Sequence, residues 1–226
     1  MGRMPGMMRG FFNPYAISFE IVYSVIVILL CFLVYFKTKD MYSLTKHKGI
    51  GFFRNTFLYF GLAFLFRLLF NLIHLGRFTF SFFIPMREIM PYSLVIIGYL
   101  STMAIFSLVL SSLWKMIKWK YFRYLVHLIA LAVAILVFFT RSTEILVISQ
   151  LALMIYAIIL SVSNFSKSKK FSHMIVIYVL LFAFWLMNLS ILLPWVRLIF
   201  EFTLASYVLS IGIFLYILFR VGKWTK

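Results

Sequence analysis

Acidic side chains are scarce in this sequence, which has 226 residues and carries five Asp and Glu against 22 Lys and Arg. The five are Glu20, Asp40, Glu88, Glu144 and Glu201, and no two of them lie close in sequence on one helical face. A local carboxylate pair for acid–base catalysis is therefore excluded. The motifs HExxH and GxSxG and a phosphate-binding glycine loop are also missing. These absences favour a role other than that of an enzyme.

Cysteine and histidine are also sparse. The single cysteine, Cys31, lies inside an apolar run, which excludes an intrachain disulfide and a cysteine metal site. Three of the four histidines, His47, His127 and His173, are expected near one membrane face together with Asp40, but their separations follow no metal-ligand spacing. The remaining histidine is expected at the other face, where it has no partner for holding a haem. We therefore expect neither a metal nor a cofactor.

Charged residues make up only 12% of the chain, whereas 65% of it is hydrophobic; an average soluble domain has roughly 25% and 45–50%. The excess is gathered in apolar runs of bilayer-spanning length. We count seven runs, which cover about residues 16–36, 52–75, 92–114, 122–139, 145–162, 174–193 and 202–219. The sequence thus predicts an all-α integral membrane protein, a single domain built as a seven-transmembrane helix bundle.

The Lys and Arg residues predict how this bundle is oriented. Of the 22, 15 fall in loops and ends on one side of the predicted spans and six on the other, while Arg67 lies within a span. Because the more basic side faces the cytoplasm, we expect the N-terminus outside and the C-terminus inside a cell membrane. The formal charge of +17 sits in short loops without a nucleic-acid-binding pattern, so membrane lipids are expected partners and nucleic acid is not.

The second span carries the least expected residues. Arg67, Asn71 and His74 share a narrow helical face, since Asn71 falls at about 40° and His74 at about −20° from Arg67 when each residue turns roughly 100°. An arginine about 12 Å inside the span is costly to leave facing lipid, so it must face a partner or water. Glu20 on the first span is the expected partner, because consecutive helices are usually adjacent. Glu201 is the competing carboxylate.

The strongly polar residues within the spans are concentrated in the predicted outer half. This asymmetry predicts an outward-facing polar cavity that binds a small polar or anionic molecule. The candidate ligand-binding residues are Glu20, Arg67, Asn71, His74, Tyr99, Gln150, Asn188, Glu201 and Tyr207. The same residues would alternatively serve as hydrogen bonds and ion pairs between helices, which supply packing specificity alone.

Two local patterns bear on the architecture. Residues 87–94 and 197–204 share Arg, Ile, an aromatic, a hydroxyl and Leu in one register, which is compatible with a 3+1+3 parallel repeat. The stretch 76–83 alternates Phe with Thr and Ser, and we expect it to form a short extended segment at the membrane interface.

The predicted topology is that of microbial rhodopsins and of the small sugar transporters called SWEETs. A rhodopsin needs a lysine in the middle of the seventh span, and 202–219 has none; SWEETs carry prolines in the first and fifth spans, and 16–36 and 145–162 have none. The chain is assigned to neither family. A small transporter is the favoured function, because such a chain would be self-sufficient. The alternatives are a sensory or receptor subunit that signals through a separate protein partner, and a structural or assembly subunit of a membrane complex.

Overall fold

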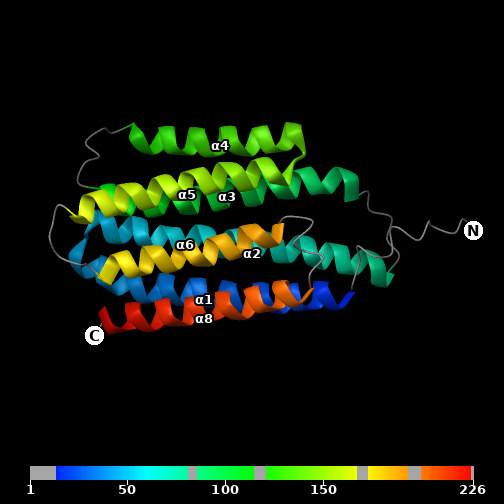
Figure 1. Cartoon of the computed structure of the whole chain (residues 1–226), viewed down its shortest axis with the longest axis horizontal. Coiled ribbons are helices and arrows are strands. Elements are labelled where there is room, and N and C mark those ends of the chain that lie inside the picture. The colour runs from blue at the N-terminus through cyan, green and yellow to red at the C-terminus, as the bar shows by residue number, and fades with distance from the viewer. Residues whose placement is uncertain (1–13, 81–85, 115–120, 167–172, 193–199, 225–226) are drawn as a thin grey trace, which may run out of the picture.

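A computed structural model describes residues 14–80, 86–114, 121–166, 173–192 and 200–224 of the chain. These residues form seven helices and no strand (Figure 1). The helices are α1 (Pro14–Thr45), α2 (Lys48–Phe80), α3 (Met86–Leu113), α4 (Phe122–Thr140), α5 (Thr143–Ser166), α6 (His173–Leu192) and α8 (Phe200–Trp224).

Five helices contain stretches long and apolar enough to cross a membrane, in α1, α2, α3, α5 and α8. The other two contain the shorter apolar stretches Tyr124–Thr140 in α4 and Val176–Leu189 in α6. A whole helix of 19 or 20 residues, as α4 and α6 are, is about 30 Å long, close to the thickness of the hydrocarbon core. The protein is a helical, multi-pass membrane protein, and the predicted fold class is confirmed.

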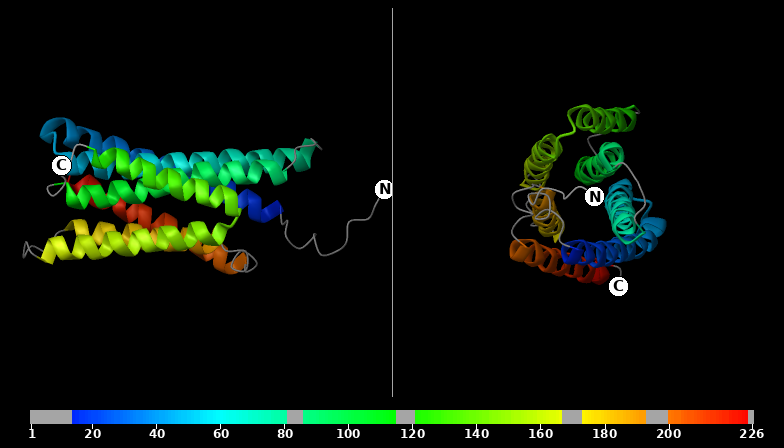
Figure 2. Two further views of the ribbon diagram at one scale, coloured as in Figure 1. Left: turned by 90° about the horizontal axis from the view of Figure 1, so that it is seen from above. Right: turned by 90° about the vertical axis from the view of Figure 1, so that its right-hand side faces the viewer.

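The helices run side by side and alternate in direction (Figure 1). Contacts between them follow the order α1, α2, α3, α5, α6, α8 and close from α8 back to α1, while α4 packs outside this ring against α3 and α5. The view along the helices shows this arrangement (Figure 2). We call the end where α1 begins the amino-terminal end, and the end where α8 finishes the carboxy-terminal end. The contact order is the one that a 3+1+3 repeat joined by α4 would produce, and the repeat itself stays a prediction.

The helices extend beyond the predicted spans because hydropathy marks only their apolar parts. Helix α1 continues to Thr45 and α2 begins at Lys48, with Lys46 in a left-handed conformation (φ 46°) at the tight turn between them. The expected extended segment is wrong for residues 76–80, since α2 remains helical to Phe80. A helix keeps its backbone hydrogen bonds internal at the membrane, and no proline lies between Lys48, where α2 begins, and Pro85. Residues 81–83 of that segment lie outside the described residues.

Aromatic side chains fill the interior of the ring between α2, α6 and α8. Phe184 contacts Phe214 with ring centroids 4.5 Å apart and Phe64 with centroids 6.0 Å apart. Phe57 reaches Phe214 at 6.0 Å, and Phe60 reaches Trp185 at 4.8 Å. These rings form one continuous apolar core at the middle of the bundle. Any polar cluster that faces the interior must lie on the amino-terminal or the carboxy-terminal side of this core.

Candidate functional site

Arg67 and Glu20 form an ion pair between α2 and α1, as the sequence predicted. Both Nε and Nη2 of Arg67 donate to Oε1 of Glu20, at 2.8 and 2.7 Å. The pair is enclosed, since 13% of the Arg67 side chain and 6% of the Glu20 side chain are exposed. Helices α1 and α2 can approach each other closely because Gly61 faces Cys31, where an added Cβ would lie 3.3 Å from the Cys31 Cβ.

Tyr23 connects this pair to two further helices. Its hydroxyl donates a 2.9 Å hydrogen bond to Oδ1 of Asn188 on α6, and Asn188 in turn donates from Nδ2 to the Phe184 carbonyl at 2.9 Å. The Tyr23 ring stacks on Tyr207 of α8, with centroids 4.2 Å apart and planes 20° apart. We call Glu20, Tyr23, Arg67, Asn188 and Tyr207 the amino-terminal cluster. It lies on the amino-terminal side of the aromatic core.

Sequence reasoning missed Tyr23 because a tyrosine in an apolar run is usually read as packing. It follows Glu20 by three residues, which places it one helical turn along and about 60° round the same helix. That spacing was the available signal. Both side chains are buried, Glu20 at 4% and Tyr23 at 2% exposure.

Two buried polar atoms close in sequence to members of the amino-terminal cluster have no hydrogen-bond partner within the described part of the chain. They are Nδ2 of Asn71 and Nε1 of Trp185. Each lies within a helical turn of a cluster member: Asn71 follows Arg67 by four residues, and Trp185 precedes Asn188 by three. A buried polar atom without a partner costs about 1–3 kcal/mol. Both atoms can donate a hydrogen bond, so a molecule rich in acceptors would satisfy them.

His74 and Glu201 lie closer to the amino-terminal end than this cluster. His74 is half-buried two turns beyond Arg67 on the predicted face of α2, and Glu201 is exposed in the first turn of α8. Arg67 pairs with Glu20 and not with the competing carboxylate of Glu201. Both His74 and Glu201 lie at the amino-terminal rim of the bundle, and their part in ligand binding stays a prediction.

The structure does not join Tyr99 and Gln150 to the cluster. The Tyr99 hydroxyl lies 2.8 Å from Nδ1 of His127, an exposed residue on α4, so Tyr99 faces the outside of the ring. Gln150 is 1% exposed between α5 and α3, where its Nε2 donates to the hydroxyls of Ser101 and Thr102. Both residues were assigned to the site by depth along their helices, and depth says nothing about the direction in which a side chain points.

The arrangement is suited to binding. Among the residues whose side chains are described, no three or more His, Cys, Asp or Glu side chains gather as they would around a metal ion. The side chain of His173, which was weighed as part of such a group, lies outside the described residues. A guanidinium with donor groups around it recognises carboxylate or phosphate oxygens, and the Glu20 carboxylate beside it can attract a cationic group.

Comparison with known proteins gives one informative relationship. No protein-family model matches the chain, and no solved structure matches it. A protein of Archaeoglobus fulgidus, described as uncharacterized, is 33% identical over 210 residues, which cover 91% of this chain and 92% of that protein. The similarity therefore spans the seven helices described above.

Proposed function

The chain and the Archaeoglobus fulgidus protein belong to one family, and we propose that this chain binds a small anionic or zwitterionic molecule at the amino-terminal cluster and transports it across the cell membrane. The single observation that carries the proposal is a buried ion pair with two buried donors near it, Nδ2 of Asn71 and Nε1 of Trp185, that lack partners within the described residues. Ion pairs serving only to hold helices together are expected to come with their neighbouring polar groups satisfied.

The residues favour an anion or a zwitterion for electrostatic reasons. Arg67 offers a planar set of N–H donors, and Asn71 and Trp185 offer further donors within a helical turn of cluster members. A carboxylate or phosphate that approached Arg67 would compete with Glu20 for the same N–H groups. A zwitterion would resolve this competition, because its cationic group could take the Glu20 carboxylate while its anionic group took Arg67.

Transport requires the aromatic core to open toward the other end of the bundle. The contact order of the ring divides it into α1–α3 and α5–α8, which touch each other through α3 with α5 and α8 with α1. Rocking of two such halves around a fixed site is a common mechanism of alternating access. Phe57 and Phe64 of α2 contact Phe214 of α8 and Phe184 of α6 in the other half, so these two contacts would separate in that motion.

The closely packed aromatic core also favours a second candidate, a receptor subunit. A ligand held above a closed core could alter helix positions without passing through, and a separate protein would then carry the signal. Binding without uptake is the result that distinguishes this function from transport.

The test uses the full chain in detergent and in proteoliposomes. The probes are inorganic phosphate, acetate, glutamate and glycine, and the readouts are the rise in melting temperature and the uptake of radiolabelled probe. We expect at least one probe to stabilise the wild type, and Arg67→Lys to weaken that binding about tenfold or more, because lysine has no planar fork. Gln150→Ala is the matched control, a buried polar residue outside the cluster, and should bind normally.

The interpretation as packing alone predicts a different outcome. Removing one member of a buried ion pair costs roughly 3–5 kcal/mol, whereas replacing both by apolar residues is often neutral or stabilising. If the double variant Glu20→Met, Arg67→Met melts like the wild type and no probe stabilises the wild type, the binding proposal is wrong. If a probe stabilises the wild type but not the double variant, the proposal stands.

A further inference from the structure

A second arginine within α2, Arg54, lies near the carboxy-terminal end. Unlike Arg67, it has no carboxylate partner among the described residues. Arg54 belongs to the second turn of α2, about 9 Å from the first residue of that helix. Its guanidinium carbon lies 4.8 Å from the centroid of the Tyr35 ring and 4.9 Å from that of Tyr42. The two tyrosines are seven residues apart on α1, so they share one face and are separated by about 10 Å along it. The guanidinium therefore lies between the two rings.

The local packing holds this arrangement in place. Gly51 lies three residues before Arg54 on α2, and a Cβ added there would stand 2.8 Å from Cε2 of Tyr42. Glycine at this position is what lets the Tyr42 ring lie against α2 beside Arg54. Arg54 is half-buried and its Nε is buried, so with rings on two sides the Nη N–H groups are those that a ligand can approach.

Within the described residues, the Nε N–H group of Arg54 has no acceptor. This nitrogen is buried, and within the described ranges Arg54 forms no ion pair. Asp40 is the nearest acidic residue in sequence, but it lies about 140–160° round α1 from both tyrosines and is exposed. Lys39, by contrast, lies within about 60° of both tyrosines and is exposed. Among the described residues, the site is thus cationic and lacks a carboxylate counter-ion.

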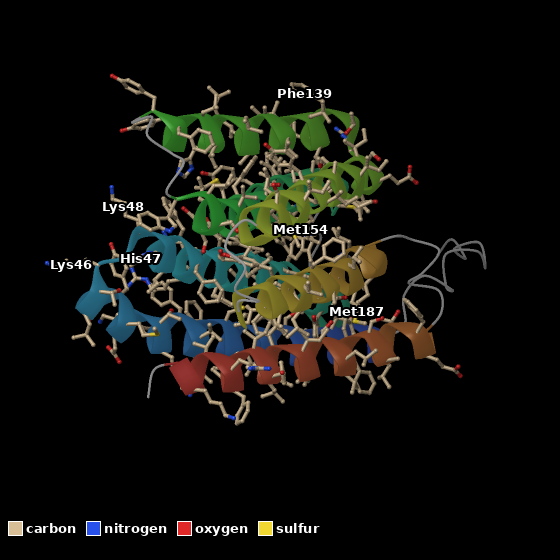
Figure 3. All side chains as sticks on the ribbon, turned by 60° about the vertical axis from the view of Figure 1, so that its left-hand side comes forward. Lys46, His47, Lys48, Phe139, Met154 and Met187 are labelled. Atoms are coloured by element: carbon tan, nitrogen blue, oxygen red, sulfur yellow. The ribbon has the colours of Figure 1, made fainter. Side chains whose placement is uncertain are left out.

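We infer that Arg54, Tyr35 and Tyr42 bind a phosphate group, and that the source of this group is the headgroup of an anionic phospholipid. A planar guanidinium binds phosphate oxygens in a bidentate way, and tyrosines are typical of the membrane interface. The predicted second span begins at residue 52, two residues before Arg54, so the guanidinium is expected near the membrane interface. Figure 3 shows Lys46, His47 and Lys48 together at the turn between α1 and α2, at the same end of the bundle. This site is separate from the amino-terminal cluster and does not depend on the transport proposal.

Native mass spectrometry of the full chain in detergent tests the site. The chain is titrated with phosphatidylglycerol and with phosphatidylcholine of identical acyl chains. We expect the wild type to hold one phosphatidylglycerol about tenfold more tightly than phosphatidylcholine, and Arg54→Gln to lose this preference. Arg220→Gln is the matched control, because Arg220 is a cation at the same end that already donates from Nε to the Tyr216 hydroxyl at 3.0 Å. It should keep the preference.

Two further variants keep the test decisive if Arg54→Gln does not fold. Arg54→Lys retains the charge without the planar fork, and Gly51→Ala retains Arg54 but displaces Tyr42; both should weaken phosphatidylglycerol binding severalfold. Equal preference in wild type and all Arg54 variants, or equal loss in Arg54→Gln and Arg220→Gln, would overturn the proposal.

Inorganic phosphate distinguishes the two sources of the same group. Competition of millimolar phosphate with phosphatidylglycerol in the wild type, absent in Arg54→Lys, would assign the site to free phosphate as well as lipid. Binding of phosphate without any preference for phosphatidylglycerol would overturn the lipid source.

Discussion

Tyr23 joins three helices, through one hydrogen bond and one ring stack. It belongs to α1, donates its hydroxyl to Asn188 on α6 and stacks on Tyr207 of α8. Its ring meets Phe64 edge-on on the core side, with centroids 5.8 Å apart, and its hydroxyl joins α1 to α6 through Asn188. The hydrogen bond therefore fixes how α6 sits against α1.

Tyr23→Phe removes this hydroxyl and keeps the ring. We expect a loss of about 1–2 kcal/mol in the free energy of unfolding, because the buried Oδ1 of Asn188 loses its donor. Tyr216→Phe is a suitable control, since Tyr216 is 41% exposed on α8, and its effect should stay within about 0.5 kcal/mol. Thermal melts in detergent measure both. Equal stability of Tyr23→Phe and wild type would show that the hydrogen bond contributes nothing.

At the residue scale, the sequence predicted which charges had to be paired but not which way most polar side chains point. The cost of a buried arginine, together with the adjacency of consecutive helices, was enough to predict the contact of Arg67 with Glu20. Tyr99 and Gln150 were expected beside Arg67 from their depth alone. The structure instead places Tyr99 against His127 and Gln150 against Ser101 and Thr102. The rotation of one helix about its own axis relative to its neighbours depends on how all side chains pack, and hydropathy does not contain that information.

At the scale of elements, α4 is attached to the ring by its small residues. Ala130 and Ala134 are fully buried, while Leu128, Leu131 and Phe139 on its other side are 65%, 50% and 78% exposed. The four-residue spacing of the two alanines is the small-xxx-small pattern that allows helices to approach closely. The exposed residues form the apolar face expected of a lipid contact.

Ala130→Leu would force this helix away from α3. Ala130 packs in one cluster with Met103 and Leu110 of α3, so added volume cannot be accommodated without moving a backbone. We expect a loss of about 1–3 kcal/mol in stability, measured by thermal melting. Leu131→Ala, on the outward face of the same helix, should change stability much less. A larger effect from Leu131→Ala than from Ala130→Leu would mean that α4 presents its other face to the ring.

The same scale explains why helix number was predictable and helix ends were not. Seven apolar runs gave seven helices, because a chain in a bilayer has to satisfy its backbone hydrogen bonds internally. The helical extensions at 37–45 and 48–51 lie beyond the apolar runs, and nothing in hydropathy requires them to stop or to continue. Pro91 is the sixth residue of α3, which begins at Met86. Because a proline disturbs the hydrogen bond to the preceding turn, only the first turn of this helix is affected.

At the scale of the whole molecule, the two arginines define two chemically different ends. Arg67 lies above the aromatic core toward the amino-terminal end and is paired, whereas Arg54 lies toward the carboxy-terminal end and is enclosed by tyrosines. The excess of Lys and Arg at the carboxy-terminal end predicts that this end faces the cytoplasm. The amino-terminal cluster would then be reached from outside the cell.

Cysteine labelling tests this orientation directly. Cys31 is fully buried and is first replaced by alanine to remove background. A cysteine is then introduced either at Ser142, between α4 and α5 at the amino-terminal end, or at Ser43, which is exposed near the end of α1. In intact cells, a membrane-impermeant thiol reagent should label Ser142→Cys and leave Ser43→Cys unlabelled, because the positive-inside rule places Ser43 in the cytoplasm. Permeabilised cells, in which both positions should react, control for local accessibility. Labelling of Ser43→Cys alone in intact cells would reverse the orientation, and the amino-terminal cluster would then receive its ligand from the cytoplasm.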